Sequence, residues 1–343
     1  MRRKLVSFRA VIALVGLSLG MAGAEASART LKIATILPDG SSWLAEMRKA
    51  GDEIKERTQG RVKLKFYPGG VMGGDKTVMR KVRAGQLQGG AFTSGALAAV
   101  YPDAELYSLP LLFRDYEEVD FVRSQLDQKI MKGLAQNGFE ALAITDGGFA
   151  YVLSQKPIRR VEDMEGTRVW LVEGDTMTDV ALRIAGVAPV PLPIADVYTA
   201  LQTGLVDTVA APPIGAIAFQ WHTRVKYLTE VPIMYLVGIF AVDQRAFSKI
   251  SAKDQKVVRE VVSAAASRLD EVNRADESNA REALKSQGIE FVSASSREEV
   301  QRWRSISAQA ITQLRGTGRY SEETINQILT LLQEHRSGAA VPE

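Results

Sequence analysis

The chain has 343 residues, 46% of them hydrophobic and 24% charged, which is ordinary for a globular protein of about two domains. It has no cysteine, which excludes a disulfide framework, thiolate catalysis and cysteine-ligated metals. The two histidines, His222 and His335, are thin material for a metal site or a Ser-His-Asp triad. We therefore expect no catalytic residue, no metal and no cofactor.

Residues 1–28 are predicted to be a secretory signal peptide. A basic start precedes an apolar run over 11–22, and Ala26–Ala28 is a small-residue cleavage site. The run is short for a membrane anchor, the alternative interpretation, so we expect a periplasmic mature chain that does not insert into the membrane. These residues carry four basic side chains and one acidic one, so without them the net charge falls from +3 to zero. That removes the electrostatic basis for a nucleic-acid partner.

The first half of the mature chain alternates strands with helices. Apolar periodicity predicts strands over 31–37, 62–67 and 89–95, and helices over 43–57 and 77–84. Hydroxyl residues just before position 43 suit a helix cap. The alternation predicts a largely parallel sheet with helices on its faces.

The second half repeats this pattern, which predicts two α/β units in tandem. Helices are expected over 176–185 and 194–203. The predicted strands are 140–145, 151–154, 167–172, a short one at 190, and 206–210.

A long helix is predicted over 251–287, because this segment has no proline or glycine and is rich in Ala, Glu, Lys and Arg. At ~1.5 Å per residue it would be roughly 50 Å long, more than one small domain needs. We expect it to lie across both units, with a simple C-terminal helix as the alternative.

Two glycine-rich segments raise the question of an anion site. The loop 69–74 is not followed by Gly-Lys-Ser/Thr, so a loop that lets the backbone approach a ligand is favoured over a phosphate cradle. The run 73–77 places Asp75 as a possible helix cap. Backbone donors for an anion and a plain cap remain equally open there. For His222, hydrogen bonding or packing is favoured over catalysis.

Several segments, in this order and spacing, carry a family resemblance. They are Gly60–Gly69, Val82–Leu87, Ser108–Phe113, Lys156–Gly166 and Pro193–Asp207. Together they show that the sequence resembles the DctP-type solute-binding proteins of TRAP (tripartite ATP-independent periplasmic) transporters. The resemblance covers nearly all of the mature chain.

The resemblance implies an α/β, two-lobed periplasmic binding protein fold with a long helix spanning both lobes. Lobe I would comprise residues 29–148 and 236–275, and lobe II residues 149–235 and 276–343, with the ligand cleft between them. A small organic ligand would close the hinge, and the closed form would dock on the small and large permease subunits in the membrane.

Three positions depart from the family pattern as the resemblance implies it. The arginine that clamps a ligand carboxylate would fall at Trp170, while Arg168 takes a position often held by lysine. A second basic position is Ala150, and a polar one is Ala211. An arginine clamp is worth about 1.5–3 kcal/mol, and burial of an indole offers a comparable apolar contribution of roughly 25 cal/mol per Å².

We therefore expect a ligand more apolar or aromatic than a C4-dicarboxylate or sialic acid, or one whose acid is held by backbone and hydroxyl donors. Beside the three positions above, the predicted ligand-binding residues are Glu173, Ser42, Trp43, Tyr67, Thr93, Ser94 and Phe219, with Ser41 as a further donor. For the hydroxyls and aromatics, ordinary capping or core roles remain open. Alternative functions are an ABC-type or chemoreceptor-linked binding protein and an enzyme on the same fold.

Overall fold

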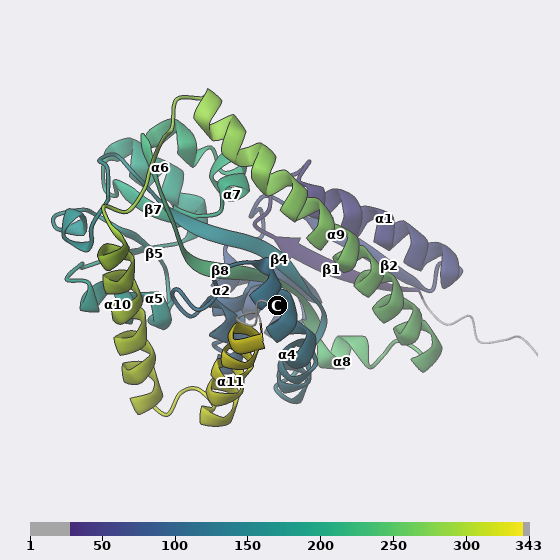
Figure 1. Cartoon of the computed structure of the whole chain (residues 1–343). Coiled ribbons are helices and arrows are strands. Elements are labelled where there is room, and N and C mark those ends of the chain that lie inside the picture. The colour runs from purple at the N-terminus through teal and green to yellow at the C-terminus, as the bar shows by residue number, and fades with distance from the viewer. Residues whose placement is uncertain (1–27, 339–343) are drawn as a thin grey trace, which may run out of the picture.

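A single sheet runs through the molecule, as seen in the computed structural model, which describes residues 28–338 (Figure 1). Its strands follow the order β2-β1-β3-β8-β4-β7, with β9 paired to β8, while β5 and β6 form a separate pair. The predicted signal peptide lies outside the described residues except for Ala28. The strands are β1 (Arg29–Thr35), β2 (Val62–Tyr67), β3 (Gly89–Thr93), β4 (Phe139–Ser154), β5 (Trp170–Val172), β6 (Val190–Leu192), β7 (Thr208–Ala211), β8 (Tyr227–Asp243) and β9 (Glu290–Val292).

Helices cover both faces of this sheet (Figure 1). The α-helices are α1 (Ser42–Arg57), α2 (Asp75–Arg83), α3 (Ser94–Leu97), α4 (Tyr116–Gln136), α5 (Thr176–Ile184), α6 (Val197–Thr203), α7 (Pro213–Ala218), α8 (Gln244–Phe247), α9 (Ala252–Ser286), α10 (Arg297–Gly316) and α11 (Glu322–Gly338). Short 3-10 helices are η1 (Pro102–Ser108), η2 (Val161–Met164), η3 (Ile194–Asp196) and η4 (Trp221–Arg224). In the described part of the chain, no helix is long and apolar enough to cross a membrane.

The prediction of a largely parallel sheet is wrong at its centre. β1 pairs in parallel with β2 and β3, but β8 is antiparallel to both β3 and β4. The pairing partners of β8 are distant in the sequence, and strand periodicity carries no information on direction.

β4 is one strand where the sequence predicted two. The pairing of β4 with β8 shifts register between Asp146 and Gly148, which is a bulge rather than a break. Gly148 has a φ of +84°, and a Cβ on Gly147 would lie 2.9 Å from the Leu236 carbonyl oxygen. Glycine is therefore required by the bulge and by the close approach of β8, and its presence does not end the strand.

The long helix α9 confirms the predicted helix over 251–287 and spans both lobes. Ser251 caps it by accepting a hydrogen bond from the Asp254 amide, and the chain leaves the helix at Gly288, where φ is +88°. Its first half buries apolar residues such as Val258 and Leu269 in a core shared with α1. Further along, it contacts β4 and α7 (Figure 1).

Candidate functional site

Trp170 is the first residue of β5, and its side chain is buried, hydrogen-bonded and packed within the protein. Its side chain is 7% exposed, and its Nε1 donates to the Leu192 carbonyl oxygen on β6 at 3.0 Å. The edge of its ring meets Trp221, with centroids 5.0 Å apart at 73°. The indole therefore contributes to the core as well as forming part of a cavity wall described below.

Trp221 links two of the predicted site residues. Phe219 stacks on it at 5.4 Å and 27°, so Trp170, Trp221 and Phe219 form one aromatic cluster. Gln220 lies between them with a φ of +59°, in the turn from α7 into η4. Trp221 is not among the ligand-binding residues predicted from the sequence. The available signal was the spacing of two aromatic residues around one polar residue.

Ala211 is the partner of Tyr151 across the β4–β7 pair, so Ala150, the residue before Tyr151, points to the opposite face of the sheet from Ala211. Both are buried, with exposures of 0% and 3%. Neither side chain can donate or accept a hydrogen bond, so neither of them can hold the acid group of a ligand.

The predicted donors Thr93 and Ser94 sit where β3 meets α3. The Thr93 amide and hydroxyl both donate to Asp75 Oδ2, at 3.1 and 2.8 Å, and the Thr93 hydroxyl accepts from the Ala96 amide. The Ser94 and Ser108 hydroxyl oxygens are 3.4 Å apart. Burial raises the pKa of the Asp75 carboxyl, and the two hydrogen bonds from Thr93 oppose that rise. Thr93 is thus already bonded within the protein.

The expectation that Asp75 caps the next helix is wrong. The N-cap of α2 is Gly74, without a side-chain hydrogen bond, because the Asp75 carboxylate turns toward β3. The neighbouring glycine loop is also internally bonded. The amides of Gly69 and Gly70 donate to the carbonyl oxygens of Leu37 and Thr35, at 2.8 and 3.0 Å.

The residues around α1 have structural roles. Ser41 caps α1 by accepting from the Leu44 amide, and Ser42 is half-buried as its first residue. Trp43 is 7% exposed and meets Phe66 and Phe240 edge-on, which leaves little of its surface for a ligand.

Tyr67 and Glu173 were also predicted to bind the ligand. Tyr67, at the end of β2, is half-buried. Glu173, in the turn after β5, is exposed, and its Oε1 lies 3.1 Å from Lys76 Nζ on α2. The pair joins segments assigned to opposite lobes. Both side chains are about half exposed or more, so the interaction is worth about 0–1 kcal/mol.

His222 Nδ1 lies 3.1 Å from the Ala216 carbonyl oxygen, consistent with a hydrogen-bonding residue.

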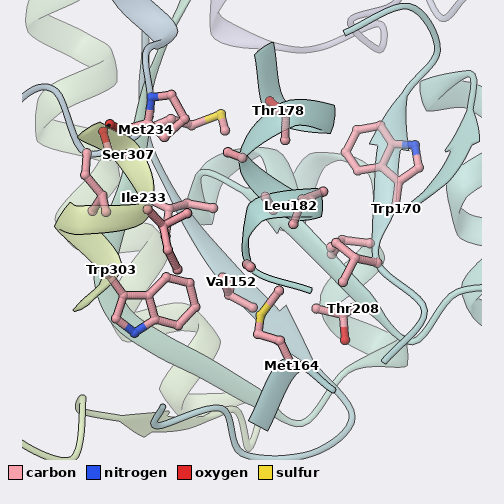
Figure 2. Close-up of a pocket in the computed structure, with 18 residues that line it drawn as sticks. Val152, Met164, Trp170, Thr178, Leu182, Thr208, Ile233, Met234, Trp303 and Ser307 are labelled. Atoms are coloured by element: carbon pink, nitrogen blue, oxygen red, sulfur yellow. Dashed lines mark hydrogen bonds between the residues drawn. The ribbon is translucent and has the colours of Figure 1, made fainter. Parts of the chain in front are cut away.

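An apolar cavity of about 80 Å³ lies between the sheet and the helices α5 and α10 (Figure 2). Trp170 and Leu182 are on one side, and Trp303 of α10 is on the other, with Val152 and Ile233 from the sheet between them. Ala181 on α5 and Ala185, the residue that follows this helix, line the space with small side chains. The sequence gives no signal for this cavity, because the cavity forms only where α10 packs back against the sheet.

The two-lobed α/β architecture, with crossing strands and one long helix, defines a class of solute-binding proteins. The family model for DctP, the bacterial extracellular solute-binding protein family 7, matches residues 33–315. The chain belongs to this family, as its sequence motifs predicted.

Relatives and solved structures agree with this assignment. The chain is 23% identical to the sialic acid-binding periplasmic protein SiaP of Vibrio cholerae, over 80% of this chain and 85% of that protein. A TRAP periplasmic solute-binding protein from Polaromonas sp. JS666, bound to D-erythronate, is 25% identical with a TM-score of 0.80, covering 89% of this chain and 98% of that one. The sugar acid-binding protein DctPAm from Advenella mimigardefordensis, in complex with galactonate, has the same fold at 19% identity, with a TM-score of 0.83 and coverage of 90% and 99%.

Proposed function

We propose that this chain is the periplasmic solute-binding subunit of a TRAP transporter. It captures a small organic acid by closure of its two lobes and delivers it to the small and large permease subunits in the membrane. The match of the family model over residues 33–315 carries this proposal. The family and its solved relatives are solute-binding proteins, which favours binding over catalysis.

The proposed solute is an organic acid with more apolar surface than a sugar acid. Solved relatives were crystallised with D-erythronate and galactonate. In this chain the positions that the family resemblance assigns to acid or polar contacts are Trp170, Ala150 and Ala211. All three are buried, and Trp170 and Ala211 belong to one hydrophobic cluster. Because apolar side chains stand where the family resemblance expects polar ones, a solute would bind here by burying hydrocarbon instead of forming an ion pair.

Native mass spectrometry of freshly purified protein tests the solute class directly. We expect a co-purified acid of low mass, whose addition raises the melting temperature of ligand-free protein. Uptake into vesicles that contain both permease subunits should then require this chain. Chemical conversion of the bound solute would indicate an enzyme instead. Uptake that requires ATP hydrolysis would indicate an ABC-type partner.

A further inference from the structure

The cavity between α5 and α10 is lined almost entirely by apolar atoms. Among the described residues, none with an ionisable side chain lines it. Three hydroxyls reach the wall, and each is already bonded within the protein. Thr178 Oγ1 donates to Asp175 Oδ2 at 2.6 Å, Thr208 Oγ1 donates to Asp207 Oδ1 at 2.9 Å, and Ser307 Oγ donates to the Pro110 carbonyl oxygen.

Water is a poor occupant for such a space. A buried water needs about 2–4 polar partners. The hydroxyls on this wall already donate elsewhere, and among the described side chains that line it only the Trp303 Nε1 is buried without a partner. A volume of about 80 Å³ is several times what one water needs, and roughly half that of an engineered cavity that takes up benzene. The dimensions and chemistry suit a short hydrocarbon group.

One residue of the cavity wall, Leu111, has an unusual backbone conformation. Leu111 on this wall has a φ of +51°, which is unusual for a bulky residue, and its amide donates to the Ile233 carbonyl oxygen at 2.8 Å. Surrounding structure must stabilise such a conformation. Leu182, Ala185 and Ile306 on the wall are only half-buried, so this side of the cavity lies close to the surface.

Trp170 occupies the position where the family resemblance expects an arginine that clamps the acid, and it also lines this cavity. Its ring is part of the wall, facing the α5 residues Thr178 and Leu182 (Figure 2). We propose that the cavity holds the hydrocarbon part of the transported solute. The solute class is then a carboxylic acid with a short branched aliphatic chain, smaller than a phenyl ring. This inference rests on the proposed function and assigns the substrate class to its site.

Calorimetry with matched acids tests the inference. We expect 3-methylbutanoate to bind at least tenfold more tightly than D-erythronate or phenylacetate. Ala181→Leu fills the cavity and should weaken 3-methylbutanoate by about tenfold or more, because one methylene in an apolar pocket is worth about 10–200-fold. Ala308→Leu makes the same change on the exposed face of α10 and should leave the affinity unchanged. Urea unfolding checks that both variants fold.

The possible failures are distinguishable. If acids bind but 3-methylbutanoate has no advantage, or if Ala181→Leu leaves its affinity unchanged, the cavity assignment is overturned and the proposed function stands. If no organic acid binds or is transported, the proposed function fails and the assignment with it. Xenon-pressurised crystals test the cavity without any solute: we expect xenon between α5 and α10 in the natural chain and none in Ala181→Leu. Absence of xenon from both would also overturn the assignment.

Discussion

Trp170 provides hydrogen-bonding and packing contributions that can be separated by mutation. Trp170→Phe removes the Nε1 bond to the Leu192 carbonyl and keeps a ring against Trp221. It should reduce the free energy of unfolding by about 1 kcal/mol. Trp170→Ala also removes the ring and should cost about 3–5 kcal/mol. Urea unfolding of ligand-free protein measures both. If Trp170→Ala were neutral, the indole would have no part in the core.

At the level of single residues, the sequence could indicate which side chains are unusual but not which partners they have. The departure from the family pattern at Trp170 was visible in the sequence, whereas its contact with Trp221 depends on how η4 returns to β5. Ser41 and Trp43 show the same limit. Capping and core packing were open alternatives for them, and both contacts are now seen. Their role toward a ligand stays a prediction.

At the level of elements, a buried acidic cluster joins η1, α5 and the turn between α10 and α11. Glu105 is 2% exposed, accepts a hydrogen bond from Tyr320 Oη, and lies 3.4 Å from Arg319 Nη2. Burial is the main reason that the pKa of Glu105 rises to about 7, and the nearby Asp175 carboxylate adds to the rise. The hydrogen bond from Tyr320 and the charge of Arg319 oppose it.

This raised pKa predicts that stability falls as the pH rises. Between about pH 4.5 and 7 the unfolded chain releases a proton that folded Glu105 retains, so the free energy of unfolding decreases with pH. Glu105→Gln should remove this decrease, an effect of up to about 3 kcal/mol at 1.36 kcal/mol per pKa unit. Urea midpoints at pH 5 and pH 8 measure it.

A second variant tests the origin of the shift. Asp175→Asn removes the neighbouring negative charge that raises the pKa of Glu105, so the decrease in stability should end at lower pH and be smaller in total. If Glu105→Gln retained the pH slope of the natural chain, another group would have to account for it. The Asp175 carboxyl, whose own pKa is raised by burial, would be the first candidate.

Helices and strands were predicted well where an uninterrupted apolar periodicity runs through the segment. The helix over 43–57, the strand over 62–67 and the helix over 251–287 are confirmed to within one residue at each end. Prediction failed where the pattern was interrupted or the pairing was distant. The glycines of β4 form a bulge, and the antiparallel position of β8 is set by residues far apart in the chain.

At the level of the whole molecule, the middle of α9 is hydrogen-bonded to the bulge of β4. Asn273 Nδ2 donates to the Asp146 carbonyl oxygen at 2.8 Å, and the Asp146 amide donates to Asp270 Oδ1 at 2.6 Å. Arg274 Nε donates to Asp146 Oδ2 at 2.9 Å. Because α9 packs on α1 before this point and contacts α7 as well, the bulge and the helix together join the two sides of the fold (Figure 1).

Loss of Arg274 should therefore destabilise the whole fold. The Asp146 side chain has no exposure to solvent, so Arg274→Ala leaves a buried carboxylate without its ion partner, at a cost of about 3–5 kcal/mol. Arg268→Ala on the same helix removes only a half-exposed arginine paired with Glu46, and should cost about 1 kcal/mol or less. Urea unfolding compares the two variants. Hydrogen exchange at residues 146–148 should show lost protection in Arg274→Ala alone. Equal costs for both variants would mean that the contact between α9 and the bulge is not what stabilises this junction.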